Sequence, residues 1–209
     1  GAETLTLDGI VFKAAVNDQI FIESNSTESD KRYAHNVTVQ NCTFDANGFS
    51  SVVGMKWRQA YNIKVTGVAA NGLHSLMQCY GCTGIDINSV TIENGKSGIA
   101  LGTSIGVTVK NTTISANPEA GYGLRAEPSG NDSVLVVENC NISAYIPLLV
   151  RDSVQGSYAL IVNGSNVMKE HNADGYWAVV SGDDYDGETA LVLPTTEVVV
   201  EVTDNGLDM

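Results

Sequence analysis

Short alternating runs of apolar and polar residues recur along the chain, each interrupted by a single asparagine, glycine or serine. In "VTVKNTTI" (Val107 to Ile114), apolar residues stand at alternate positions on both sides of Asn111, and "VTVQNCTF" (Val37 to Phe44) repeats the pattern around Asn41. Alternation of this kind is typical of a strand with one buried face. The pattern therefore predicts two short β-strands that meet at the asparagine.

The same pattern occurs seven times, which indicates a structural repeat. The copies are LTLDGIVF (5–12), VTVQNCTF (37–44), IKVTGVAA (63–70), IDINSVTI (85–92), VTVKNTTI (107–114), LVVENCNI (135–142) and LIVNGSNV (160–167). Their fifth residues are Gly9, Asn41, Gly67, Ser89, Asn111, Asn139 and Gly164, so the repeat length varies between 22 and 32 residues. A fixed motif at a variable spacing predicts that one turn of each repeat takes up the insertions.

The fifth residue of each copy is predicted to be a corner. Side chains on both sides of it must face one interior, which requires a sharp bend near the left-handed backbone conformation that Gly and Asn adopt with least strain. A third apolar patch follows most copies: QIFIES (19–24), SVVGMKW (51–57), LHSLMQC (73–79), GIALG (98–102), GLRAE (123–127) and PLLVR (147–151). Each repeat thus contains three strands, which we expect to stack in parallel on the next repeat about 4.8 Å away.

With these features the sequence resembles the pectin-lyase-like right-handed parallel β-helix, whose coils carry an Asn-marked bend between their second and third strands. The resemblance covers about Leu5 to Val167 and implies an all-β, single-stranded parallel β-helix of about seven coils. Residues 1–170 are assigned to the β-helix and residues 171–209 to a terminal coil and capping β segment. Strand-like runs in that segment are Trp177 to Val180 and Glu197 to Val202. A small separate β module is the alternative for it.

The alternation also predicts which side chains face the interior of the coil. They are Val37, Val39, Cys42 and Phe44; Ile85, Ile87, Val90 and Ile92; Val107, Val109, Thr112 and Ile114; and Val136, Cys140 and Ile142.

Composition and charge limit the kinds of partner that the protein can bind. The chain has 209 residues, 43% of them hydrophobic, with 11 basic and 24 acidic residues and a net charge of −13. Such a charge repels a phosphate backbone, so nucleic acid is a poor partner. No apolar run approaches the roughly 20 residues that a membrane-spanning helix needs. The first residues do not form a signal peptide, so any export signal is expected to lie outside this sequence.

Four cysteines are too few for a disulfide scaffold. Cys79 and Cys82 have the spacing of a redox pair, but that chemistry draws on a helix N-terminus and no helical pattern follows. A turn with two thiols, or a local disulfide, is favoured. Zinc would need more ligands than His74 nearby supplies. Cys42 and Cys140 lie four repeats apart, about 19 Å, and are interpreted as small core residues.

Two further motifs match known functional sites only in part. Gly102 to Gly106 matches the letters of a nucleophile elbow, but a strand follows it where a helix is required, so a turn is favoured. The acidic run Gly182 to Glu188 offers hard oxygen ligands that suit calcium. Aligned with an EF-hand loop it lacks carboxylates at the first and last positions, which favours a solvated turn. The weak calcium candidates are Asp183, Asp184, Asp186 and Glu188.

Sugar-cleaving members of the family place their groups on the outer face of the first strand of each coil and on the turn after it. By this resemblance, the corresponding face of this chain is expected to contain Glu23, Lys56, Trp57, Arg58, Gln78, Tyr80, Arg125, Glu127, Arg151 and Asp152. Basic groups there suit a uronate or sulfate, and an exposed Trp57 or Tyr80 suits stacking on a sugar ring. The predicted ligand-binding set is Lys56, Trp57, Arg58, Tyr80, Arg125 and Arg151. The alternative is that these charges only keep the sheet face soluble.

Two functions stay open. The catalytic carboxylate pattern of the family's lyases and hydrolases is not recognisable, which favours a non-catalytic module: glycan-binding, adhesin-like or structural, at the surface of a bacterium. Seven Asn-x-Ser/Thr sequences, the motif for N-glycosylation, also occur. Two of them lie at the corners Asn41 and Asn111, where a Thr after the corner produces the motif without any role in glycosylation. This fits a bacterial protein. The alternative is a small polysaccharide lyase or glycosidase acting on acidic polysaccharide through Arg125, Glu127 and Arg151, with calcium as a possible cofactor.

Overall fold

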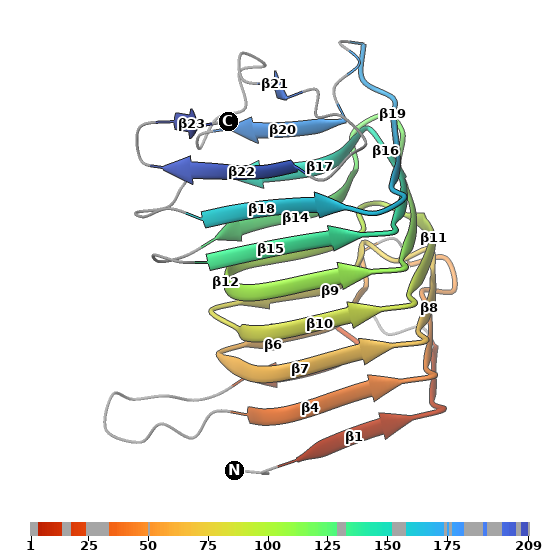
Figure 1. Ribbon diagram of the computed structural model, residues 1–209. Coiled ribbons are helices and arrows are strands. Elements are labelled where there is room, and N and C mark those ends of the chain that lie inside the picture. The colour runs from red at the N-terminus through yellow and green to blue at the C-terminus, as the bar shows by residue number, and fades with distance from the viewer. Residues whose placement is uncertain are drawn as a thin grey trace.

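Each repeat of the sequence forms one turn of a right-handed parallel β-helix (Figure 1). The computed structural model describes residues 4–13, 18–23, 34–49, 51–128, 133–151, 158–173, 175, 177–181, 190–191, 198–203 and 206–208. All regular elements among them are β-strands. The predicted stacking of parallel strands is therefore confirmed.

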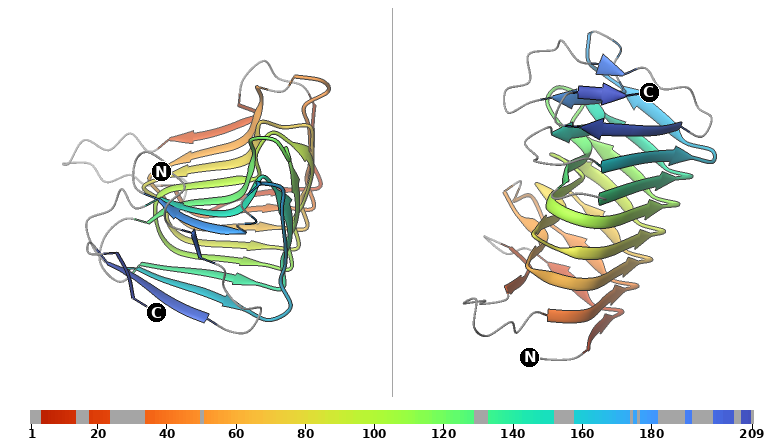
Figure 2. Two further views of the ribbon diagram at one scale, coloured as in Figure 1. Left: turned by 90° about the horizontal axis from the view of Figure 1, so that it is seen from above. Right: turned by 60° about the vertical axis from the view of Figure 1, so that its left-hand side comes forward.

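The strands form three faces, here called sheets A, B and C. Sheet A contains β1 (Leu5–Asp8), β4 (Ala34–Gln40), β7 (Ala60–Thr66), β10 (Thr83–Asn88), the second half of β12 (Ile99–Lys110), β15 (Ser133–Glu138) and β18 (Tyr158–Asn163). Sheet B has seven strands: β2 (Val11–Lys13), β5 (Thr43–Asp45), β8 (Ala69–Asn71), β11 (Thr91–Gly95), β13 (Thr113–Ala116), β16 (Asn141–Ala144) and β19 (Val167–Glu170). Sheet C contains β3 (Ile20–Glu23), β6 (Val53–Arg58), β9 (Ser75–Tyr80), the first half of β12, β14 (Tyr122–Pro128), β17 (Ile146–Arg151) and β20 (Ala178–Ser181). Seen from above, the strands of each sheet lie over one another (Figure 2).

The predicted corner between sheets A and B is confirmed in all seven copies. The φ angles are +66° at Gly9, +53° at Asn41, +60° at Gly67, +55° at Ser89, +48° at Asn111, +53° at Asn139 and +72° at Gly164. All seven lie in the left-handed region, which Gly enters freely and Asn with little strain, whereas another L-residue such as Ser89 is strained there.

Side-chain amides connect these corners along the axis. Asn41 Nδ2 donates a hydrogen bond to Asp8 Oδ1 at 2.9 Å, and Asn111 Nδ2 donates to Asn88 Oδ1 at 2.9 Å. The amide also restricts the next coil, because a Cβ at Gly67 would lie 3.0 Å from Asn41 Oδ1. Asn41 therefore favours glycine at the corner above it.

Two further columns of left-handed residues, one between sheets C and A and one near the start of the sheet A strands, were not predicted. One contains Gln59, Gly81 and Thr103, with φ of +53°, +64° and +46°. The other contains Asn36, Asn62, Gly84 and Gly106, with φ of +52°, +52°, +68° and +66°. Gln and Thr are not residues that mark such a conformation in a sequence, which is why the first column was missed.

The predicted interior is confirmed at all but one position. Val37, Phe44 and Ile92 are at most 1% exposed, and Thr112 is fully buried with its hydroxyl donating to the Lys110 carbonyl at 2.8 Å. Val136 was predicted to face inward, and this is wrong, because it is only half-buried. Its neighbours on both sides, Leu135 and Val137, are buried in its place. Four consecutive apolar residues, Val134 to Val137, hid the alternation, which the corner at Asn139 sets.

Strands of the C-terminal segment cover one end of the column. β20 continues sheet C in parallel, and β21 (Ala190–Leu191) pairs with it in antiparallel orientation. β22 (Val198–Thr203) lies antiparallel on β18, and β23 (Gly206–Asp208) pairs with β22. β20 and β22 match the two runs expected there, whereas the boundary at residue 170 stays a prediction.

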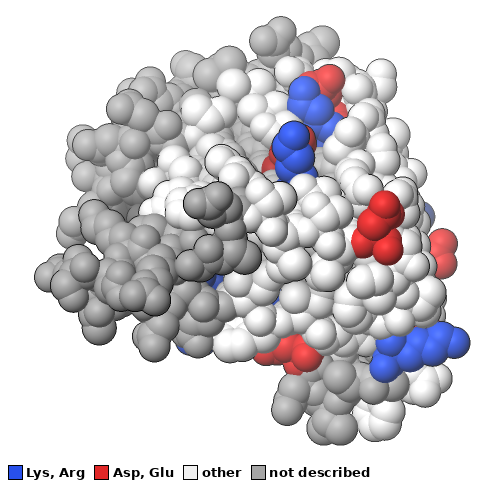
Figure 3. Space-filling model, turned by 90° about the horizontal axis from the view of Figure 1, so that it is seen from below, with Lys and Arg blue, Asp and Glu red and all other residues white. Residues whose placement is uncertain are grey.

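At the other end, β1, β2 and β3 each pair with one described strand only. The inward side chains of this first coil, Leu5, Leu7, Phe12 and Ile22, are half-buried, and Phe12 stacks on Phe44 at 4.7 Å between ring centroids. Viewed from this end, charged side chains of the described residues lie mainly near the rim (Figure 3).

We expect Ile114→Asp to destabilise the protein severely. Ile114 is 1% exposed, so the substitution forfeits about 1.5–3 kcal/mol of burial and places a carboxylate in the apolar interior. Thr113→Asp is the matched control, because Thr113 is exposed on the outer face of the same strand. Thermal melts followed by circular dichroism measure both; equal melting temperatures for the two variants would contradict the register.

We expect the first coil to lose stabilisation in acid. Hydrogen bonds from Asn41 and Gln40, both 2.9 Å, lower the pKa of Asp8 below its ordinary value of 3.8. A depressed folded-state pKa means that this stabilisation is present above 3.8 and is lost as pH falls through the folded-state pKa. The melting temperatures of the wild type and of Asp8→Asn, followed from about pH 6 to about pH 2, should therefore converge below 3.8. A difference that stays constant across this range would refute the assignment.

Candidate functional site

Two columns of side chains project from the outer face of sheet C. The register aligns Phe21, Lys56, Gln78, Ala100, Arg125 and Leu149 in the first column. The second column contains Arg58, Tyr80, Gly102 and Glu127, and the backbone of Glu23 pairs with that of Arg58. Neighbouring members of a column are about 4.8 Å apart, and the two columns are separated by two residues along each strand, or about 6.6 Å. The face therefore collects most of the candidate site residues.

Trp57 was expected to be exposed on this face, and this is wrong. Its side chain is fully buried in the interior, beside that of Cys79 in the register. Lys56 and Arg58 point outward, and side chains alternate along a strand, so the residue between them must point inward. Trp57 therefore belongs to the core and cannot stack on a ligand.

Phe21, which was not predicted, is the exposed aromatic residue in this part of the face. It is 50% exposed, and two cations lie against its ring: Lys56 Nζ at 6.0 Å and the Arg58 guanidinium carbon at 5.8 Å from the centroid. Lys56 also pairs with Asp18 at 3.7 Å. These contacts hold the ring and both cations in one cluster. Ile20 and Ile22 point inward, so the alternation along the strand would have predicted from the sequence that Phe21 points outward.

Tyr80 is exposed, as predicted, with 43% of its surface accessible. It ends β9 directly before the corner at Gly81. In the register it faces Arg58 on one side and Gly102 on the other. A Cβ at Gly102 would lie 3.1 Å from Tyr80 Cδ1, so the ring leans over the glycine.

Arg125 is fixed by three interactions. It forms an ion pair with Glu127, Nη1 donates to the Tyr122 hydroxyl at 3.3 Å, and its guanidinium carbon lies 5.6 Å from the centroid of the Tyr122 ring. Arg125 and Glu127 are both partly buried, with side chains 26% and 17% exposed. A partly buried, hydrogen-bonded pair of this kind is more rigid than a solvated surface pair.

Arg151 ends β17, on the coil next to Arg125 as expected. Arg125 is nevertheless paired with Leu149, whereas Arg151 follows Val150, the partner of Ala126. The two arginines therefore occupy different positions in the backbone register. Asp152, also expected near this face, lies outside the described residues.

Cys79 and Cys82 are free and buried, as one of the two predicted alternatives required. Burial raises the pKa of the Cys79 thiol, whereas a hydrogen bond from Cys79 lowers the pKa of Cys82 to about 7. Cys42 and Cys140 are also free and 1% exposed, which confirms them as core residues. All four thiols thus face the interior, away from the columns of sheet C.

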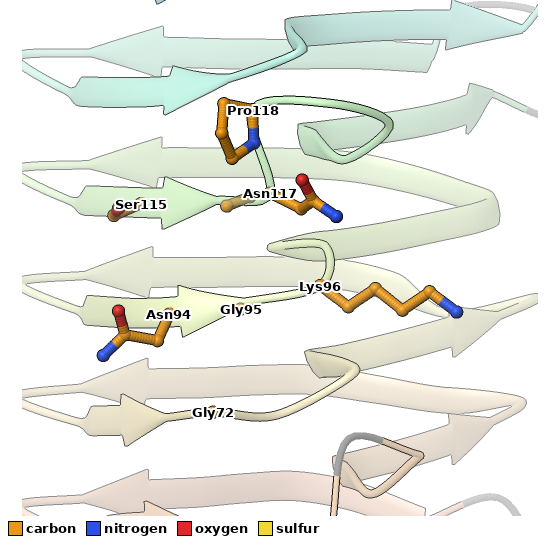
Figure 4. A pocket seen from close by; sticks show the side chains of 8 residues that line it. Gly72, Asn94, Gly95, Lys96, Ser115, Asn117 and Pro118 are labelled. Carbon is orange, nitrogen blue, oxygen red and sulfur yellow. The ribbon is translucent and has the colours of Figure 1, made fainter.

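A pocket of about 480 Å³ lies at the turns between sheets B and C (Figure 4). It is lined by Gly72, Asn94, Gly95, Lys96, Ser115, Ala116, Asn117 and Pro118. Figure 4 shows Asn94 pointing one way from its turn and Lys96 and Asn117 pointing the other way. Because these polar groups diverge, the outer face of sheet C is the better candidate site.

The described residues contain no cluster of three or more His, Cys, Asp or Glu side chains with metal-binding geometry. The calcium candidates Asp183, Asp184, Asp186 and Glu188 lie outside these residues. Gly102 to Gly106 lies within β12 and turns the chain from sheet C to sheet A, in agreement with the turn predicted there. The described part of the chain also has no helix of the length and hydrophobicity that crossing a bilayer takes.

Comparisons with protein-family models, with curated proteins and with solved structures find no match to this chain. What is established is the class of protein, a parallel β-helix with aromatic and charged side chains gathered on one sheet.

Proposed function

We propose that the protein is a non-catalytic glycan-binding module that uses the outer face of sheet C. The observation that carries the proposal is the pair of exposed rings, Phe21 and Tyr80, at 50% and 43% exposure on that face. Aromatic rings offer an apolar face to the C–H groups of a sugar, while fixed polar groups beside them bind hydroxyls. Both kinds of group are present here.

The spacing of the rings favours an oligosaccharide over a single sugar. Phe21 and Tyr80 are two coils and two residues apart, which corresponds to about 12 Å. One ligand that contacts both must therefore extend over several rings. Lys56 and Arg58 lie between the two aromatic residues and would contact the same chain.

The proposal also includes the location at which the protein acts. The sequence resembles pectin-lyase-like β-helices, and the acidic composition suits a soluble exported protein. We infer an extracellular, adhesin-like or structural role at the surface of a bacterium. In that setting the glycan would come from the envelope of a cell or from surrounding polysaccharide.

Substituting the two rings tests the proposal. We expect Phe21→Ala and Tyr80→Ala each to weaken binding to soluble polysaccharides about tenfold, equivalent to about 1.4 kcal/mol. Phe49→Ala is the matched control, because Phe49 is 49% exposed but lies in the turn before β6. Migration in native gels that contain neutral or uronate polysaccharides measures the affinity. Equal behaviour of all three variants and the wild type would refute the proposal.

The same panel addresses the alternative of a lyase or glycosidase. Arg125, Glu127 and Arg151 are the residues to which that alternative assigns the reaction. Release of unsaturated sugars or reducing ends, with and without calcium, is followed for the wild type and Arg125→Ala. Activity that disappears in Arg125→Ala would replace binding by catalysis as the function.

A further inference from the structure

The corner between sheets C and A turns two side chains of a coil into the interior. They stand three residues apart, on either side of a two-residue bend whose second residue is left-handed. In three successive coils these pairs, at most 3% exposed, are Trp57 and Ala60, Cys79 and Cys82, and Leu101 and Ser104. The corner therefore directs the first and fourth residues of a four-residue segment into the same part of the core.

Of these three pairs, the one in the middle coil consists of two thiols. The Cys79 thiol donates a hydrogen bond to the Cys82 sulfur, so the two sulfur atoms are already in contact. Cys82 in turn donates to the Tyr80 carbonyl at 3.7 Å. Gly81 adopts its φ of +64° without strain, so the bend itself costs little. A disulfide requires two side chains that point toward each other, and this corner supplies that arrangement.

We propose that Cys79 and Cys82 form a disulfide across this corner when an organic disulfide, such as oxidised glutathione, oxidises them. One cysteine thiolate attacks a sulfur of the oxidant, which releases one thiolate and leaves a mixed disulfide. The second cysteine loses its proton, attacks the first cysteine's sulfur and displaces the other thiolate. Two S–H bonds are thus replaced by one S–S bond. The oxidant takes up the two electrons and the two protons and becomes two thiols.

Burial determines when this reaction occurs. Both residues are fully buried in the folded protein, and burial raises the pKa of the Cys79 thiol, so the folded chain does not offer its thiolate to an oxidant. We therefore expect the bond to form while the chain folds in an oxidising compartment. The completed coils then shield it from reductants. This inference goes beyond the proposed glycan binding and does not depend on it.

The experiment compares protein refolded with oxidised and reduced glutathione with protein refolded in dithiothreitol. Free thiols are then alkylated in denaturant, and trypsin releases residues 65–96, a peptide that contains Cys79 and Cys82 and no other cysteine. After oxidative refolding we expect this peptide to be unalkylated and lighter by two hydrogen atoms than its thiol form. Cys42 and Cys140 should be alkylated in both preparations. The oxidised protein should melt about 5 °C higher, because the short closed loop restricts the unfolded chain.

Cys82→Ser tests whether this pair causes the shift in melting temperature. Ser104 occupies the equivalent position of the next coil, and its buried hydroxyl donates to the Gly102 carbonyl at 3.0 Å. A serine at position 82 finds the same kind of acceptor in the Tyr80 carbonyl, so the variant should fold. We expect it to melt at the same temperature in both preparations.

Cys140→Thr is the matched control, because it removes one buried thiol and leaves the pair intact. Thr112 occupies the equivalent position of the preceding coil, and its hydroxyl donates to the Lys110 carbonyl at 2.8 Å. In the same way Cys140 donates to the Glu138 carbonyl at 3.4 Å, so a threonine there finds its acceptor in place. The difference of about 5 °C between the two preparations should persist in this variant.

Several results would overturn the inference. They are alkylation of all four cysteines after oxidative refolding, a bond that includes Cys42 or Cys140, and glutathione that stays attached to Cys82. A bonded wild type that melts no higher than the reduced protein would show that the corner strains the bond. Persistence of the shift in Cys82→Ser, or its loss in Cys140→Thr, would assign it to other groups. None of these results bears on glycan binding, which the aromatic-ring variants test separately.

Discussion

The fold depends on a steric constraint at the corner between sheets A and B. The side chains before and after the corner must enter the same interior, so one residue between them adopts a left-handed backbone conformation. Stacking then brings corner onto corner. Where Asn41 extends its amide toward the next coil, only the missing side chain of Gly67 leaves room for it. One local constraint thus aligns the corners along the axis and, at Asn41 and Gly67, favours this pair of residues.

This constraint explains how much of the fold could be predicted from the sequence. Asn111 and Asn139 mark corners because few other residues tolerate the conformation, and the apolar residues on both sides then locate the interior. Gln59 and Thr103 adopt the same conformation without any such mark. They follow from the stacking of whole coils, which a short stretch of sequence does not contain.

The candidate site was less predictable for a related reason. A strand presents alternate residues, so Lys56 and Arg58 on the outer face exclude Trp57 from it, and the same rule brings Phe21 outward. Gly102 lies against two side chains from other coils, Tyr80 and Glu127. Such a contact between residues distant in sequence appears only once the register of three coils is known.

The reversal of strand direction at β22 has a consequence for assembly. A parallel coil offers its edge as a template on which an identical coil can add, and repeated addition of that kind produces fibrils. β22 runs against β18, and Glu201 to Thr203 on its far side pair with β23. Antiparallel strands space their hydrogen bonds differently from parallel ones, so an incoming coil finds no matching partners on this side. The reversal of strand direction at β22 therefore opposes polymerisation through sheet A.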